Sequence, residues 1–208
     1  MISRALLLSL LLTGVSHAEI IDRVVGTVGN QVITQSEVIR QTRIAAFLND
    51  EPVDLSAASR RKTAERIIEQ ELIRREAQLS RYPQPESWEA EKLLSETKAA
   101  RTNTDAEWTG LLKKYGITEE ELIRHFTLQL RALRFTDFRF RPAVQVSESD
   151  VREYHTRKYA GRTAPPFEDA REKLERDLID EKVDQSLDRW LKEARVTTRV
   201  EIREDSFQ

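Results

Sequence analysis

The side chains best suited to chemistry in this 208-residue sequence are two histidines, His125 and His155, and a run of interleaved arginines and phenylalanines between Arg124 and Arg141. The sequence contains no cysteine, so the two histidines have no thiolate partners and form no recognisable zinc set. The sequence also lacks a G-x-S-x-G elbow and a glycine-rich phosphate loop. We therefore expect no catalytic residues, no metal and no cofactor, and we expect both histidines at the surface or the core edge.

Pairs of carboxylates are the other residues that could do acid–base chemistry. Glu65 with Glu69 and Asp180 with Asp184 are four residues apart, so each pair lies on one face of a predicted helix. Asp, Glu, Lys and Arg make up 34% of the sequence, and helices with so many charges usually present them to water. These pairs need no enzymatic explanation.

The arginine–phenylalanine run allows three interpretations. Interleaved basic and aromatic residues can bind single-stranded nucleic acid, but the formal net charge of −2 disfavours a polyanionic partner. The phenylalanines could instead fill the core at the end of a long helix while the arginines pair with acidic neighbours. Alternatively, they could line a groove for aromatic-rich unfolded chains, with guanidinium groups stacked on rings. The candidate peptide-binding residues are then Trp108, Tyr115, Phe126, Phe135, Phe138 and Phe140.

Residues 1–18 have the pattern of a secretory signal peptide. Arg4 precedes an apolar run over residues 5–12, and Ser16-His17-Ala18 is a small-x-small cleavage site, which predicts a cut between Ala18 and Glu19. The apolar run is far shorter than the roughly 20 residues that cross a bilayer. We therefore expect a periplasmic protein with no stable membrane insertion. Removing Arg4 changes its net charge to −3, which again disfavours nucleic acid.

The segment after the signal predicts a β-hairpin that leads into a helix. Its β-branched residues suit strands, and Gly29-Asn30 suits the positive φ angles of a tight turn. Thr34 and Glu37 form a T-x-x-E capping box, which is typical of a helix start.

Apolar residues with a period near 3.6 predict a series of helices along the rest of the chain. In the long helix after Thr118, the stripe of Leu122, Phe126, Leu130 and Leu133 is expected to face the core. The predicted helices span residues 35–48, 56–80 and 86–102, a short segment after Thr104, a long one after Thr118, then 147–159 and 167–194.

The chain ends in a predicted strand over residues 196–202, where Val196, Val200 and Ile202 alternate with polar residues. A lone strand cannot satisfy its own backbone groups, and the only other strand material is the N-terminal hairpin. We therefore expect a mainly α fold in which the hairpin and the C-terminal strand form a small antiparallel sheet. Nothing divides residues 19–208 into two domains.

Three stretches of the chain resemble the SurA-type periplasmic chaperones and their relatives, the secreted foldases PpiD and PrsA. They are residues 21–23 with 28–34 and Glu37, residues 144–151 with Tyr154, and residues 167–191 with the strand to Ile202. The resemblance implies a chaperone domain like the SurA N-terminal domain. It also implies a holdase that binds unfolded polypeptides, such as outer-membrane proteins in transit.

The chain departs from these foldases at residues 160–166. The resemblance implies a parvulin-type prolyl isomerase domain at this place, and seven residues can form only a linker. We therefore expect no isomerase activity. Two alternatives remain: an isomerase relative whose activity is lost or supplied by another chain, and an adaptor that docks a folded partner or forms a homodimer through its terminal strand.

Overall fold

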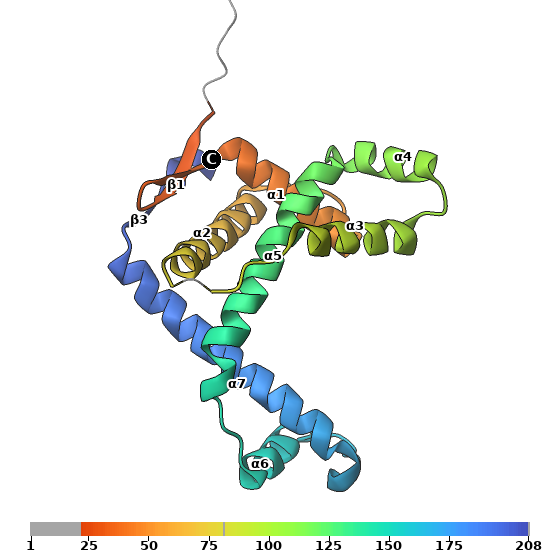
Figure 1. Ribbon diagram of the computed structural model, residues 1–208, viewed down its shortest axis with the longest axis vertical. Helices are drawn as coiled ribbons and strands as arrows, with labels where there is room; N and C mark the ends of the chain where they lie inside the picture. Colours follow the sequence, from red (N-terminus) through yellow and green to blue (C-terminus); the bar gives the residue numbers. More distant parts are fainter. Residues whose placement is uncertain (1–21, 81, 208) are drawn as a thin grey trace, which may run out of the picture.

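The computed structural model describes residues 22–80 and 82–207, and within these ranges it is mainly helical with one small sheet (Figure 1). This confirms the predicted fold class. The predicted signal peptide and its cleavage site at Ala18 and Glu19 lie outside the described residues. The elements are β1 (Val24–Val28), β2 (Gln31–Thr34), α1 (Gln35–Asn49), α2 (Ala57–Leu79), α3 (Ser87–Arg101), α4 (Asp105–Tyr115), α5 (Glu119–Arg139), the 3-10 turn η1 (Arg141–Ala143), α6 (Glu148–Lys158), α7 (Phe167–Thr197), β3 (Val200–Ile202) and the 3-10 turn η2 (Glu204–Phe207).

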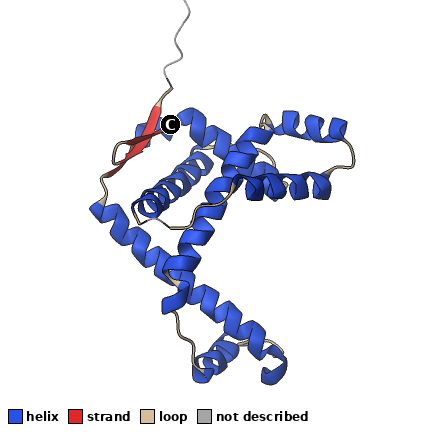
Figure 2. Cartoon of the chain, viewed as in Figure 1, coloured by secondary structure: helices blue, strands red, loops and turns tan. Residues whose placement is uncertain are grey.

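The sheet joins the two ends of the described chain, as predicted (Figure 2). Its strand order is β2-β1-β3, and both pairings are antiparallel. The two-residue turn between β1 and β2 contains Gly29 at φ 58°, which a glycine adopts without strain. At Gly26 a Cβ atom would lie 2.7 Å from the Glu201 carbonyl oxygen, so a glycine is needed where β3 pairs with β1.

The third strand is shorter than predicted. Helix α7 continues to Thr197, and only residues 200–202 pair with β1. The strand was predicted to begin at Val196 because the valines alternate with polar residues. Val196 instead projects from the outer side of α7 and is 87% exposed. The helix ends where the Thr198 backbone N–H donates to the Ala194 carbonyl oxygen at 2.9 Å.

Local capping explains where several helices begin. Capping boxes at Thr104–Glu107 and Thr118–Glu121 start α4 and α5, the two helices expected after Thr104 and Thr118. At the start of α1, the Thr34 hydroxyl accepts from the Glu37 backbone N–H at 3.4 Å. Asp22 adds a cap that was not predicted, because its carboxylate accepts from the Ser36 backbone N–H at 3.1 Å.

Two buried clusters form the core of what we call the body. One lies between the sheet, α2, the end of α5 and the end of α7, and the other lies between α1, α3, α4 and the start of α5. A third, small cluster joins α6 to the first half of α7, and together these two segments form an arm that projects from the body (Figure 1). In the described ranges, none of the helices combines the length and apolar composition that crossing a membrane requires.

Candidate functional site

The six aromatic residues proposed for peptide binding do not form one surface groove. Trp108, Tyr115 and Phe126 are buried in the second core cluster. The rings of Trp108 and Tyr115 pack edge-on against Phe47, with centroids 5.8 Å and 5.5 Å away. The Trp108 indole N–H donates to Glu119 at 2.6 Å. These side chains stabilise the junction of α1, α4 and α5 and leave no surface for a ligand.

The other three aromatic residues lie at the far end of α5, in the first core cluster or beside it. Phe135 is fully buried, with its ring centroid 4.8 Å from that of Trp190, and Phe140 is partly buried beside them. Phe138 is 61% exposed and meets Tyr82 edge-on. Of the six residues, Phe138 alone presents most of its side chain to solvent.

Four of the five arginines of the same run form ion pairs with acidic side chains, and the fifth, Arg131, donates to the Gln84 amide oxygen at 2.9 Å. Arg134 binds both carboxylate oxygens of Glu89, at 2.7 Å and 2.6 Å. Arg141 binds Asp180 at 2.9 Å. Core filling with paired arginines thus describes Phe135, Arg134 and Arg141, but it does not describe Phe138 or Arg131.

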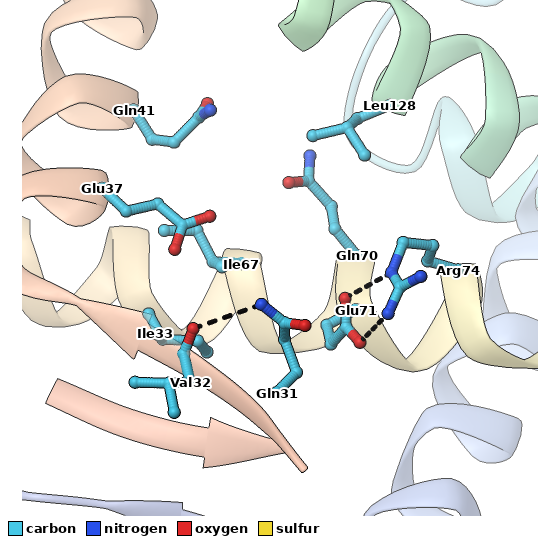
Figure 3. A pocket seen from close by; sticks show the side chains of 10 residues that line it. All are labelled: Gln31, Val32, Ile33, Glu37, Gln41, Ile67, Gln70, Glu71, Arg74 and Leu128. Atoms are coloured by element: carbon cyan, nitrogen blue, oxygen red, sulfur yellow. Dashed lines mark hydrogen bonds and ion pairs between the residues drawn. The ribbon is translucent and has the colours of Figure 1, made fainter. Parts of the chain in front are cut away.

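A different set of residues lines a cleft, which we call the polar cleft (Figure 3). It lies between β2, α1, α2 and α5 and has a volume of about 170 Å³. Its floor is apolar and most of its other side chains are amides or charged groups. The lining residues are Gln31, Val32, Ile33, Glu37, Gln41, Ile67, Gln70, Glu71, Arg74 and Leu128.

Helix α2 supplies one wall of the polar cleft. Ile67, Gln70, Glu71 and Arg74 recur at three- and four-residue steps, so they share one face of the helix. The buried Glu71 carboxylate accepts two bonds from the Arg74 guanidinium, at 2.7 Å and 2.6 Å. This bond to Glu71 raises the pKa of Arg74. The two charges neutralise one another, and Arg74 also donates to Gln78 at 2.9 Å.

Glu37 supplies a second carboxylate from α1. Burial raises the pKa of Glu37, while the positive charge of Arg40 acts in the opposite direction. Arg40 itself forms an ion pair with Glu121, with Nε 3.7 Å from the carboxylate oxygen. The polar cleft therefore contains one neutralised ion pair and one further carboxylate, whose negative charge is offset only at a distance.

Gln41 is held in place by His125. The Nδ1 atom of His125 lies 2.9 Å from the Gln41 amide oxygen, and since that oxygen can only accept, Nδ1 carries the proton. Burial, helped by the charge of Arg66, lowers the pKa of His125 to about 4, so the ring is neutral near pH 7. This bond occupies the amide oxygen of Gln41 and leaves its NH₂ group for a ligand.

The hydrogen-bond pattern of the sheet shows which backbone groups of β2 face outward. Gly29 N–H donates to Arg199 O at 2.7 Å, and Arg203 N–H donates to Val25 O at 2.8 Å. Every second residue of β1 from Val25 onward therefore faces β3, and the intervening residues face β2.

The residues of β2 that pair with these intervening positions use their backbone groups for the ladder. Val28 pairs with Gln31, and Gly26 pairs with Ile33. Val32, which lies between them, therefore directs its N–H and C=O away from β1. Among the described residues, its carbonyl accepts only a long bond, 3.4 Å, from the side-chain amide of Gln31 (Figure 3). Within residues 22–80 and 82–207, the sheet thus has an uncovered edge at the rim of the polar cleft.

A second depression, which we call the apolar hollow, adjoins the polar cleft. It has a volume of about 450 Å³ and shares Gln70 with the cleft. Leu133, expected in the core stripe of α5, is 57% exposed here, because α2 and α3 flank this part of α5 without covering it. The hollow is lined by Gln70, Leu93, Gln129, Leu130, Ala132 and Leu133.

The sequence analysis assigned none of the residues that line the polar cleft to a functional site. The available signal was the spacing of Glu37 with Gln41 and of Gln70 with Arg74, which places each pair on one helix face. Such spacings are common on solvated helices, so they did not stand out. Across residues 22–80 and 82–207, no three His, Asp or Glu side chains gather as a metal site. The arrangement offers hydrogen bonds and charge for non-covalent binding.

Comparison of the chain with protein-family models and with curated proteins found no match.

Proposed function

We propose that this protein is a holdase, a chaperone that binds unfolded polypeptide and delays its aggregation. The observation that carries the proposal is the adjacency of the polar cleft and the apolar hollow, which share Gln70. An extended polypeptide presents apolar side chains and unpaired backbone amides side by side. A surface that offers an apolar depression next to amide side chains can meet both needs.

The glutamines suit this role chemically. Each primary amide carries two donors and an acceptor oxygen, so it can pair with the N–H or the C=O of any peptide unit. Gln31, Gln41 and Gln70 come from three different elements and line one cleft. Backbone recognition of this kind is independent of client sequence, and several weak contacts give breadth instead of selectivity.

The proposed compartment and clients follow from the resemblance to SurA-type chaperones. An exported holdase would meet outer-membrane proteins in transit through the periplasm. Their strands alternate apolar and polar residues and expose edges that aggregate until a barrel closes. Binding to the unfolded client competes with that aggregation by mass action, without a cofactor or a chemical step.

The test is aggregation of an unfolded outer-membrane protein diluted from urea, followed by light scattering with equimolar purified protein. We expect the wild type to suppress scattering. Leu133→Glu places a charge in the apolar hollow and should weaken client affinity about tenfold, because it removes roughly one buried leucine contact. Leu79→Glu is the matched control, since Leu79 is 79% exposed and lies outside the hollow.

Absence of suppression by the folded wild type, verified by its melting transition, would refute the holdase function. Equal loss of suppression in both leucine variants would show that clients do not bind specifically at the apolar hollow.

A further inference from the structure

The uncovered edge of β2 supports a more specific inference, which rests on the proposed function. We propose that a client segment binds as a short fourth strand along β2 and places a basic side chain in the polar cleft, against Glu37. The occupant is thus an extended, unfolded polypeptide that carries a lysine or an arginine.

The outward N–H and C=O of Val32 can form a pair of hydrogen bonds with one residue of an added strand. The turn at Asn30 and the helix that begins at Gln35 limit the edge on both sides. The added strand is therefore short, because it can lie only along the four residues of β2.

Strand alternation decides which client side chain enters the cleft. Ile33 is buried toward α2, so the side chain of its neighbour Val32 points to the opposite face of the sheet. The client residue that pairs with Val32 points the same way. Its two neighbours then point toward α2, where the polar cleft opens.

The charges of the cleft select a basic side chain there. Arg74 is already bound to Glu71 and Gln78, so it has little capacity for an acidic ligand. Glu37 has a raised pKa because burial disfavours its charge, and a cation beside it would favour the charged form. The stem of a lysine can lie along Ile67 and Leu128 while its ammonium group reaches the carboxylate.

The experiment measures binding of fluorescent peptides by anisotropy at low salt. The reference peptide is Thr-Val-Lys-Val-Thr, the second peptide carries Glu in place of Lys, and a third has N-methylated valines. We expect the Lys peptide to bind about tenfold more tightly than the Glu peptide, and we expect high salt to reduce the difference. The N-methylated peptide should lose about tenfold in affinity, because it cannot donate to the edge strand.

Two variants test the same contacts from the side of the protein. Val32→Pro removes the outward N–H while leaving the ladder to β1 intact, and it should weaken the reference peptide about tenfold. Val32→Thr keeps the N–H and is the matched control. Glu37→Gln retains a side chain that suits the helix start and removes the charge, so it should abolish the preference for lysine over glutamate.

Equal binding of the reference and N-methylated peptides would overturn strand addition, and this comparison holds even where Val32→Pro fails to fold. Unchanged lysine preference in Glu37→Gln would overturn the role of the cleft. If the wild type suppresses aggregation and both variants suppress it equally well, the inference fails while the holdase function stands.

Discussion

The body and the arm are held together by different means, although one helix, α7, belongs to both. In the body, the end of α7 packs with the sheet and α2 around buried apolar side chains such as Ile68 and Leu191. In the arm, only Val151, Leu174 and Leu178 form a buried cluster between α6 and α7.

Ion pairs and stacked cations surround this small cluster of the arm. Lys158 binds Asp177 at 2.5 Å, and Arg157 binds Glu181 at 2.8 Å. The guanidinium of Arg152 lies 4.1 Å from the centre of the Phe167 ring. Exposed ion pairs of this kind contribute roughly 0–1 kcal/mol each, far less than a buried leucine or isoleucine. The arm is therefore expected to open locally while the body stays folded.

The largest expected effect is unfolding of the body when the chain is truncated after Arg199. The truncation removes β3 and the buried Phe207, and with them the bonds from Ser206 to Val24 O and from Arg60 to Phe207 O. We expect a loss of about 5 kcal/mol or more, comparable to the whole stability of a small domain. Circular dichroism melting checks this, and Val196→Ser on the exposed side of α7 serves as the control. A truncated protein with an unchanged melt would show that the sheet is dispensable.

Matched core substitutions in the body and in the arm should have different effects on stability. Ile68→Ala in the body and Leu174→Ala in the arm each truncate a side chain that is almost fully buried. We expect Ile68→Ala to lower the global stability by about 3 kcal/mol. Leu174→Ala should accelerate hydrogen exchange in α6 and the first half of α7 and leave exchange in the sheet unchanged. Equal acceleration of exchange throughout the molecule by Leu174→Ala would mean that arm and body form one cooperative unit.

Acid should affect the body before the arm. The pKa of His125 is about 4 in the folded protein and near 6.5 when unfolded, so the unfolded chain takes up the proton first. The stability from the neutral ring is complete above pH 6.5 and falls by at most about 3 kcal/mol as the pH drops toward 4. In the arm, the bond from Lys158 lowers the pKa of Asp177 below 3.8, so its contribution is complete above about pH 3.8 and is lost only as the pH falls from there through that lower value.

Urea unfolding at several pH values, with hydrogen exchange to assign each region, checks this order. His125→Gln should flatten the pH dependence of the body between pH 6.5 and 4. A variant that keeps the wild-type slope would place the responsible group elsewhere.

The smallest expected effect is that of salt on the arm. Raising the salt concentration to about 1 M shortens the screening length to about 3 Å, so the exposed ion pairs of α6 and α7 should weaken. We expect somewhat faster hydrogen exchange in α6, by an amount equivalent to about 1 kcal/mol or less. Exchange in α2 should stay constant, because its protection comes from apolar burial. Equal changes of hydrogen exchange in α6 and α2 would show that ion pairs stabilise the arm no more than they stabilise the body.

Local codes account for the parts of the fold that could be predicted from the sequence. A turn such as Gly29-Asn30 and a box such as Thr118–Glu121 act over two to four residues, and the structure contains both. The end of α7 was misplaced because Val196 fits a strand and a helix equally well until the pairing partner is known.

The candidate site could not be predicted because it depends on contacts between distant elements. Trp108 and Leu133 look equally apolar in the sequence, yet α1 and α5 bury the first while the second is 57% exposed. Likewise, Glu37 and Gln70 resemble any polar residues on charged helices. Only the packing of α1 against α2 and β2 turns them toward one cleft.

The central position of β1 has a consequence for how the protein forms. Gly26 pairs with Ile202, about 175 residues further along the chain, so β1 cannot complete its hydrogen bonds until almost the whole chain is available. Contacts of such long range slow folding, because a large loop must close before they contribute. The hairpin would first carry two open edges, with β3 closing one of them last. The β2 edge then stays open in the folded protein, as it was in the hairpin before β3 paired.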